Sequence, residues 1–154
     1  MIIIVAGKKF EMLPQVMKRF RENIDKNMSG LLKLIGEQVV GRSRDKYLSG
    51  PRPKKLGHIS GNLAQSVLFR VEESRVTVGS NLPYAPVHEF GATIRAKRAP
   101  FLRFKTLDGK WHSVKSVTIP ARPFLRPAIA DSIGVMKRLT VAMFNRAYAG
   151  ASGV

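Results

Sequence analysis

Residues 84–92 read YAPVHEFGA, which sets a histidine beside a glutamate in an apolar segment that ends in glycine. A zinc peptidase helix needs His-Glu-x-x-His, because only the i, i+4 spacing puts two imidazoles on one helix face. Here His88 and Glu89 are followed by Ala92 where the second ligand would stand. The spacing excludes that metal site and favours an architectural role: about two helical turns, closed by Gly91 in a left-handed C′ position.

Extended segments flank this short helix. The runs Val67–Val71 and Arg75–Gly79 surround Glu72–Ser74 and predict a hairpin with one buried face. Residues 93–119 predict further strands, with Leu107–Lys110 as the clearest turn, because Asp-Gly favours a tight hairpin.

Helical periodicity marks the two ends of the chain. Apolar residues recur at steps of three and four over residues 13–28 and 31–47, which predicts an amphipathic helical region. Asn27–Gly30 leaves open whether this region is one helix or two, since a glycine costs only about 1 kcal/mol inside a helix. Pro127 stands where a last helix begins. We therefore expect an α+β fold with a long N-terminal helical region, an antiparallel sheet with hairpins, and a C-terminal helix packed on the sheet.

The length of 154 residues corresponds to about one domain. We expect a single domain over residues 1–154, with a short strand at 2–5, a mobile basic loop at about 49–62 and a frayed end from about 149. The absence of cysteine excludes disulfides and thiolate zinc sites. The opening MIIIVAG is too short to cross a bilayer and lacks the basic first region of a signal peptide, so we expect neither membrane association nor export.

The charge is the strongest bulk signal, with 27 Lys and Arg against 10 Asp and Glu and a net charge of +17. Such a field attracts polyanions and acidic protein surfaces. Between residues 92 and 126, which we call the basic band, Asp108 is the only acid among Arg95, Lys97, Arg98, Arg103, Lys105, Lys110, Lys115, Arg122 and Arg126. The partner of this band is DNA or an acidic neighbour in an assembly. Candidate contacts to DNA or to a neighbouring ring, in the loop and in the band, are Arg52, Lys54, Lys55, Arg95, Lys97 and Arg98.

Signatures of catalysis are missing. The chain has three histidines, His58, His88 and His112, and no serine in a Gly-x-Ser-x-Gly elbow. It also lacks a phosphate-binding loop and a dinucleotide fingerprint. We expect no enzyme, no catalytic or metal-binding residues and no cofactor.

Three aromatic residues, Phe101, Phe104 and Trp111, lie among the cations of the basic band, where such side chains can stack bases. The known nucleic-acid-binding signatures are missing, and we expect these three residues in the hydrophobic core. Pro-Phe-Leu-Arg occurs at 100–103 and again at 123–126. We expect each copy to anchor its phenylalanine beneath a chain direction that proline fixes.

These segments together carry a family resemblance. Tyr84–Ala85 with His88–Gly91, and later Ile119–Leu125 (IPARPFL) leading into a terminal helix, resemble the minor tail or tail-completion proteins of tailed bacteriophages, also called virion morphogenesis proteins. Ser60–Leu63 with Ser66 is similar to the segment that follows the N-terminal helices in that family. Residues 75–79 resemble its next strand.

The resemblance implies an α+β subunit that assembles into a ring at the neck or upper tail of the virion, helps to finish the tail and joins it to the DNA-filled head, without catalysis. The implied partners are copies of itself, in a ring that we expect to be sixfold or twelvefold, and neighbouring neck, connector and tail proteins, with packaged DNA as a further contact. The implied location is the virion, after assembly in the host cytoplasm. The alternative is a free nucleic-acid-binding protein that uses the basic band.

Within that resemblance, we expect YAPVHEFGA and IPARPFL to meet and frame a surface that binds copies of the same chain. Gly91 turns the chain and His88 is half-buried. The candidate residues for subunit packing are Tyr84, His88, Glu89, Phe90, Gly91, Arg122, Pro123 and Phe124.

Two contacts within this set are specific hypotheses. We expect Tyr84, Phe90 and Phe124 to pack together. We expect Glu89 to face Arg122 or a basic group of the adjoining subunit, because Glu89 is the sole acid between Ser74 and Leu107.

Overall fold

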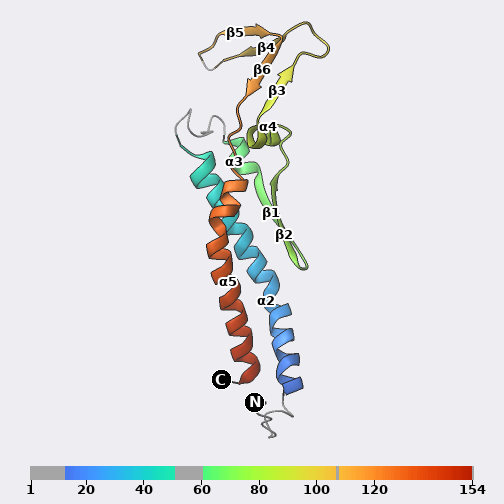
Figure 1. Ribbon diagram of the computed structural model, residues 1–154, viewed down its shortest axis with the longest axis vertical. Coiled ribbons are helices and arrows are strands. Elements are labelled where there is room, and N and C mark those ends of the chain that lie inside the picture. Colours follow the sequence, from blue (N-terminus) through green and yellow to red (C-terminus); the bar gives the residue numbers. More distant parts are fainter. Residues whose placement is uncertain (1–12, 51–60, 107, 154) are drawn as a thin grey trace, which may run out of the picture. The chain divides into compact units, whose positions relative to one another are not determined.

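The computed structural model describes residues 13–50, 61–106 and 108–153 (Figure 1). The strand predicted at 2–5 and most of the loop predicted at 49–62 lie outside these residues. Tertiary contacts divide the chain into two compact units. Of the described residues, the first contains 13–40, 69–78 and 131–153, and the second contains 41–50, 61–68, 79–106 and 108–130.

The N-terminal helical region is one helix, α2 (Leu13–Arg42), which runs through Gly30 without a break. The predicted apolar stripe is covered unevenly along it: Leu13 and Met17 in the first turns are 49% and 54% exposed. The residues of α2 that are buried all lie in its second half, and they are Leu31, Leu32, Gly36, Val39 and Val40.

The C-terminal helix, α5 (Arg126–Ser152), packs against α2 in the first unit. The ring of Phe20 lies 6.3 Å from that of Phe144 and 6.4 Å from that of Tyr148, centroid to centroid. Asn23 donates a side-chain hydrogen bond of 3.2 Å to the carbonyl oxygen of Ala147. These contacts join two segments more than 120 residues apart in the sequence, since the hydrogen bond alone spans 124 positions.

The predicted hairpin is confirmed as β1 (Val67–Glu72) and β2 (Arg75–Ser80), which are hydrogen-bonded neighbours. In the first unit, Phe69 of β1 lies directly against α2 at Gly36, where an added Cβ would collide with the phenyl ring. The close approach of strand and helix therefore requires glycine at this position.

The second unit begins where α2 continues into a π-helical turn, Ser43–Leu48, followed by the short helix α3 (Asn62–Ser66). Arg44 ties the two together, because its guanidinium donates hydrogen bonds of 2.9 and 2.7 Å to the carbonyl oxygens of Ala64 and Val67. Val67 itself is fully buried.

Two antiparallel ribbons make up the rest of the sheet structure in the second unit. Strand β3 (Ala92–Arg95) pairs with β6 (Ser116–Ile119), and β4 (Leu102–Lys105) pairs with β5 (Trp111–Val114). The predicted Asp-Gly turn joins β4 to β5, with Gly109 at a φ of 81°. In the described part of the chain the strands thus form three two-stranded sheets in place of one larger sheet, and the α+β class is confirmed.

Three expectations about burial are corrected. Phe101 and Trp111 are 47% and 66% exposed, so they do not belong to a hydrophobic core. Of the two Pro-Phe-Leu-Arg segments, only the second anchors its phenylalanine, since Phe124 is 3% exposed. At the end of the chain, α5 is helical to Ser152 and Ala151 is buried, where the sequence predicts a frayed end.

Candidate functional site

Glu89 joins a short helix to the start of a long one. Helix α4 (Ala85–Phe90) turns Glu89 toward the segment that opens α5, and the residue is only 5% exposed. One of its oxygens accepts the backbone N–H of Phe124 at 2.8 Å and of Leu125 at 2.9 Å. The other accepts the backbone N–H of Arg126 at 3.0 Å and its side-chain Nε–H at 3.1 Å. Glu89 thereby caps the N-terminus of α5.

The electrostatics of this cap favour a charged carboxylate. Burial alone acts to raise the pKa of Glu89, but the backbone N–H groups of Leu125, Phe124 and Arg126, together with the Arg126 side chain, lower that pKa below its ordinary value. The first N–H groups of a helix have no partner within the helix, and their dipoles point at a negative group placed there. The carboxylate satisfies the N–H group of Arg126 in the first turn and those of Phe124 and Leu125 just before it, and it remains ionised at neutral pH.

The predicted ion pair between Glu89 and Arg122 is wrong. The basic partner is Arg126, whose guanidinium also donates to the carbonyl oxygen of Glu89 at 3.2 Å. Arg122 contributes through its backbone, because its N–H donates a 2.8 Å hydrogen bond to the carbonyl oxygen of His88. His88 is half-buried, as predicted. The two sequence motifs do meet, but mainly through backbone donors.

Gly91 turns the chain between α4 and β3, in a conformation that differs from the predicted one. Its φ of 73° is positive, but its ψ of 161° lies outside the left-handed helical region. That combination is accessible essentially only to glycine. A Cβ here would also lie 2.9 Å from the backbone nitrogen of Ala121 and 3.1 Å from the carbonyl oxygen of Ile119. Both backbone strain and close approach exclude other residues.

The aromatic residues of the motif lie on the surface. Tyr84 and Phe90 are 40% and 63% exposed, so they do not form one buried cluster with Phe124. The ring of Tyr84 instead meets His88 edge to face at 5.9 Å, and the guanidinium of Arg126 lies 4.8 Å from the centroid of the Phe90 ring. Phe90 and Pro123 are both exposed and available to a partner.

The ribbon β3–β6 has two different faces. Residues directly opposite each other in an antiparallel pair share a face, and neighbours along a strand alternate. The register pairs Ala92 with Ile119 and Ile94 with Val117, which makes one face wholly apolar. On the other face Thr93 and Thr118 share a 3.1 Å hydrogen bond between their hydroxyl groups, and Arg95 lies opposite Ser116.

The ribbon β4–β5 repeats this division. Its apolar face carries Leu102 opposite Val114 and Phe104 opposite His112, with the last two rings stacked at 5.8 Å. Its other face carries Arg103 opposite Ser113 and Lys105 opposite Trp111. We call this second surface, Arg103, Lys105, Trp111 and Ser113, the cationic face.

Residues 92–123, which we call the arm, contain both ribbons. Among the arm residues that the structure describes, none is buried. The apolar faces are therefore only partly covered by the subunit itself, and Ile94 is 39% exposed. The predicted contact residues Arg95, Lys97 and Arg98 lie exposed on the arm, whereas Arg52, Lys54 and Lys55 lie outside the described residues.

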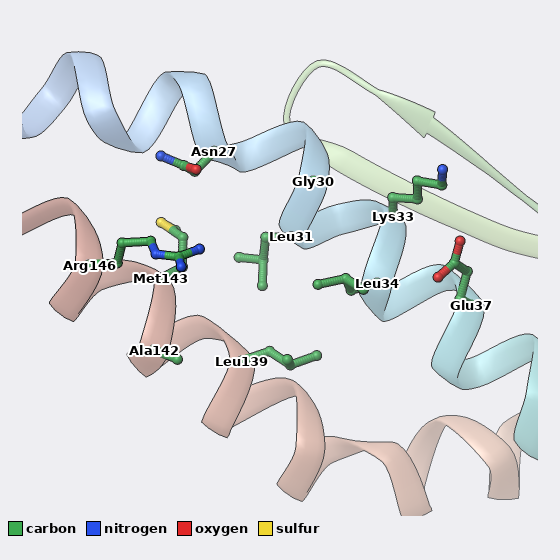
Figure 2. Close-up of a pocket in the computed structure, with 10 residues that line it drawn as sticks. All are labelled: Asn27, Gly30, Leu31, Lys33, Leu34, Glu37, Leu139, Ala142, Met143 and Arg146. Atoms are coloured by element: carbon green, nitrogen blue, oxygen red, sulfur yellow. The ribbon is translucent and has the colours of Figure 1, made fainter.

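A second apolar surface lies between α2 and α5 in the first unit. Figure 2 shows Leu31 and Leu34 of α2 facing Leu139 and Met143 of α5 across a groove that Ala142 also lines. Leu34 is 50% exposed. Polar residues complete the lining of this groove, which we call the α2–α5 groove: Asn27, Lys33, Glu37 and Arg146.

Neither a metal centre nor a membrane-spanning helix is found among the described residues. Within 13–50, 61–106 and 108–153, acidic and histidine side chains form no group of three or more that would hold a metal ion. No helix of the described chain combines the length and apolar character needed to span a membrane.

Two features of these surfaces escape sequence reasoning, although signals for both are present. The alternation in Ala92–Arg95 and Leu102–Lys105 marks two-faced strands, but the register that aligns the faces comes from the structure. Arg126 as the partner of Glu89 is signalled by its position beside Pro127, a residue typical of a first helical turn. The α2–α5 groove has no comparable local signal.

Comparison with known proteins gives one match and two negative results. Residues 40–143 match the model of the phage virion morphogenesis family. Comparisons with curated proteins and with solved structures give no match. The matched region contains the Glu89 cap, the arm, the whole β1–β2 hairpin and α5 as far as Met143, but only the last three residues of α2. Because it covers more than half of the chain, the protein belongs to the phage virion morphogenesis family.

Proposed function

We propose that this protein is a ring-forming structural subunit at the head–tail junction of a phage, where it completes the tail and joins it to the head. Family membership gives the chain a structural or assembly role in the virion, which is consistent with a protein that is not an enzyme. The ring, its place at the junction and its sixfold or twelvefold symmetry are the proposed part.

One observation carries the proposal: both ribbons of the arm have an apolar face, and no described arm residue is buried. An isolated two-stranded ribbon is marginally stable in water and needs cover on its apolar face. The Glu89 cap fixes the base of the arm, because it ties α4, directly before β3, to the segment directly after β6. The arm is thus anchored at its base, and its apolar faces are only partly covered along its length.

A second copy of the chain is the occupant that we propose for these faces. The α2–α5 groove offers exposed apolar surface, led by Leu34, that matches the apolar faces of the arm, and Glu37 in its lining is an acid that can meet a cation of the arm. A contact between two different patches of identical subunits is heterologous, and it closes into a ring when the rotation divides a full turn. A stable contact of this kind buries at least about 1,000 Å².

The test mixes two variants that each lack one half of the contact. Ile94→Asp places a charge on the apolar face of the arm, and Leu34→Asp places one in the groove. Each variant alone is expected to be monomeric in native mass spectrometry, whereas the wild-type protein forms rings. Mixed together, the intact groove of one and the intact arm of the other form a single contact, so a heterodimer is expected and nothing larger. Thr93→Asp, on the polar face of the same ribbon, is the control that keeps the rings.

Several results would contradict the arm-in-groove contact. If Ile94→Asp still forms rings, the arm is not part of the interface. If the mixture of the two variants stays monomeric, the arm does not bind the groove. If the wild-type protein is monomeric but binds other virion proteins through the arm, the partner of the arm is one of those proteins and not a second copy of this chain. A wild-type monomer whose only association is with DNA, weakening log-linearly with salt, favours the free nucleic-acid-binding alternative.

The place in the virion has its own test. A phage that lacks this chain is expected to accumulate filled heads and unjoined tails in electron micrographs. Supplying the wild-type protein restores joined particles, and Ile94→Asp does not. Normal joined particles without the chain exclude the head–tail junction.

A further inference from the structure

Trp111 is placed unusually for the largest apolar side chain in the protein. It is the single tryptophan of the sequence, and it is 66% exposed near the tip of the β4–β5 ribbon. It lies on the cationic face, and the apolar face described above is on the other side of the ribbon. The contact proposed between subunits therefore does not account for it.

Cations surround the indole. The guanidinium of Arg103 lies 5.8 Å from the centroid of the Trp111 ring, a cation–π distance. Lys105 is directly opposite Trp111 in the register, and Lys110 precedes it in the turn, 3.9 Å from the carboxylate of Asp108. Arg103 and Lys105 are two residues apart on one strand, roughly 7 Å along the ribbon. That separation is comparable to the step between adjacent phosphates of an extended nucleic-acid strand.

We propose that the cationic face binds single-stranded nucleic acid. A base stacks on the exposed surface of the Trp111 indole, while Arg103 and Lys105 contact neighbouring phosphates. An aromatic platform with cations alongside it suits single strands, because every base has a π-face and the backbone charge is continuous. A paired duplex presents the same phosphates but keeps its bases stacked inside. This site goes beyond the ring proposed above, and both can be occupied together because they use opposite faces of the ribbon.

The single tryptophan provides a direct probe. Titration of the wild-type protein with oligothymidylate is expected to quench its tryptophan fluorescence, and the affinity is expected to fall log-linearly with salt. A duplex of equal phosphate number is expected to leave the fluorescence largely unchanged. Equal quenching by duplex and single strand, or no quenching by either, overturns the proposal.

Substitutions separate stacking from general charge. Trp111→Leu is expected to weaken the binding of a labelled oligothymidylate, followed by anisotropy, by about 5- to 150-fold, the range for one stacked base. The double variant Arg103→Gln with Lys105→Gln is expected to weaken it and to make the salt dependence shallower. The control is Arg70→Gln with Lys137→Gln, which removes the same charge from exposed positions of the first unit. If the control loses as much affinity as the Arg103 and Lys105 variant, the binding depends on net charge alone. If Trp111→Leu binds as tightly as the wild-type protein, no base stacks on Trp111.

Ring formation is measured on the same variants. Trp111→Leu is expected to form rings as the wild-type protein does, so that failure of nucleic-acid binding leaves the proposed ring untouched. If Trp111→Leu loses its rings, Trp111 belongs to the contact between subunits and the nucleic-acid site is wrong.

Discussion

The carboxylate of Glu89 accepts hydrogen bonds from both the backbone N–H and the side chain of Arg126, 37 residues further along the chain. This pair fixes where α5 begins and closes the base of the arm. Because the carboxylate is buried and meets three backbone donors, its loss leaves those donors without a charged partner.

Glu89→Gln is expected to destabilise the protein by about 2–3 kcal/mol, since hydrogen bonds to a charged group contribute more than neutral ones and the amide of glutamine faces donors with its own N–H. The measurement is denaturant unfolding at pH 7. Glu22→Gln, at an exposed position of α2, is the control and is expected to change stability by less than about 0.5 kcal/mol. Equal losses of unfolding free energy in the two variants would show that the Glu89 cap does not stabilise the fold.

The same carboxylate predicts a pH dependence. The pKa of Glu89 is lowered in the folded protein, while in the unfolded chain it is about 4.3. The ionised form is thus favoured by folding, so its contribution is present above the unfolded pKa and is lost as pH falls through the folded pKa. The stability difference between wild type and Glu89→Gln is expected to shrink from about pH 6 to about pH 3. A difference that stays constant over this range contradicts the assignment.

The two Pro-Phe-Leu-Arg segments provide a matched pair. Phe124→Ala is expected to cost about 3–5 kcal/mol, because it empties a buried site. Phe101→Ala, at a ring that is 47% exposed, is expected to cost less than about 1 kcal/mol in the isolated subunit. Thermal or denaturant unfolding of both variants measures this contrast, and similar losses would contradict the burial of Phe124.

Gly91→Ala is expected to destabilise the protein by about 2–3 kcal/mol, since the added Cβ meets the backbone of Ala121 and the positive φ is unfavourable for alanine. Gly79→Ala is the control, because no heavy atom lies within 4 Å of a Cβ there and its φ is not positive. Denaturant midpoints of the two variants are compared. Tolerance of alanine at Gly91 would mean that the turn can open without loss.

The predictable part of the fold is the part that local chemistry determines. The hairpin at Val67–Ser80, the Asp-Gly turn and the helix start at Pro127 follow from turn residues and periodicity, and all are present. The exposure of Trp111 does not follow from the sequence, because most aromatic residues lie in a hydrophobic core. Here the side chain belongs to a two-stranded ribbon, which is too small to cover it.

The details of the site depended on tertiary geometry. Arg122 and Arg126 are four positions apart on an extended, proline-rich path, so the sequence does not determine which of them reaches Glu89. The start of α5 at Arg126 decides it, because the backbone N–H and the guanidinium of this first helical residue both reach the carboxylate. The ψ of Gly91 follows from the same junction, which carries the chain past Ala121.

The arm contributes none of the subunit's fully buried side chains among the described residues. Its sequence can therefore drift, or be exchanged for that of a related phage, with little effect on the folding of the molecule that carries it. If the arm forms the contact proposed above, selection on the choice of neighbours and selection on thermal stability act on different residues of one short chain.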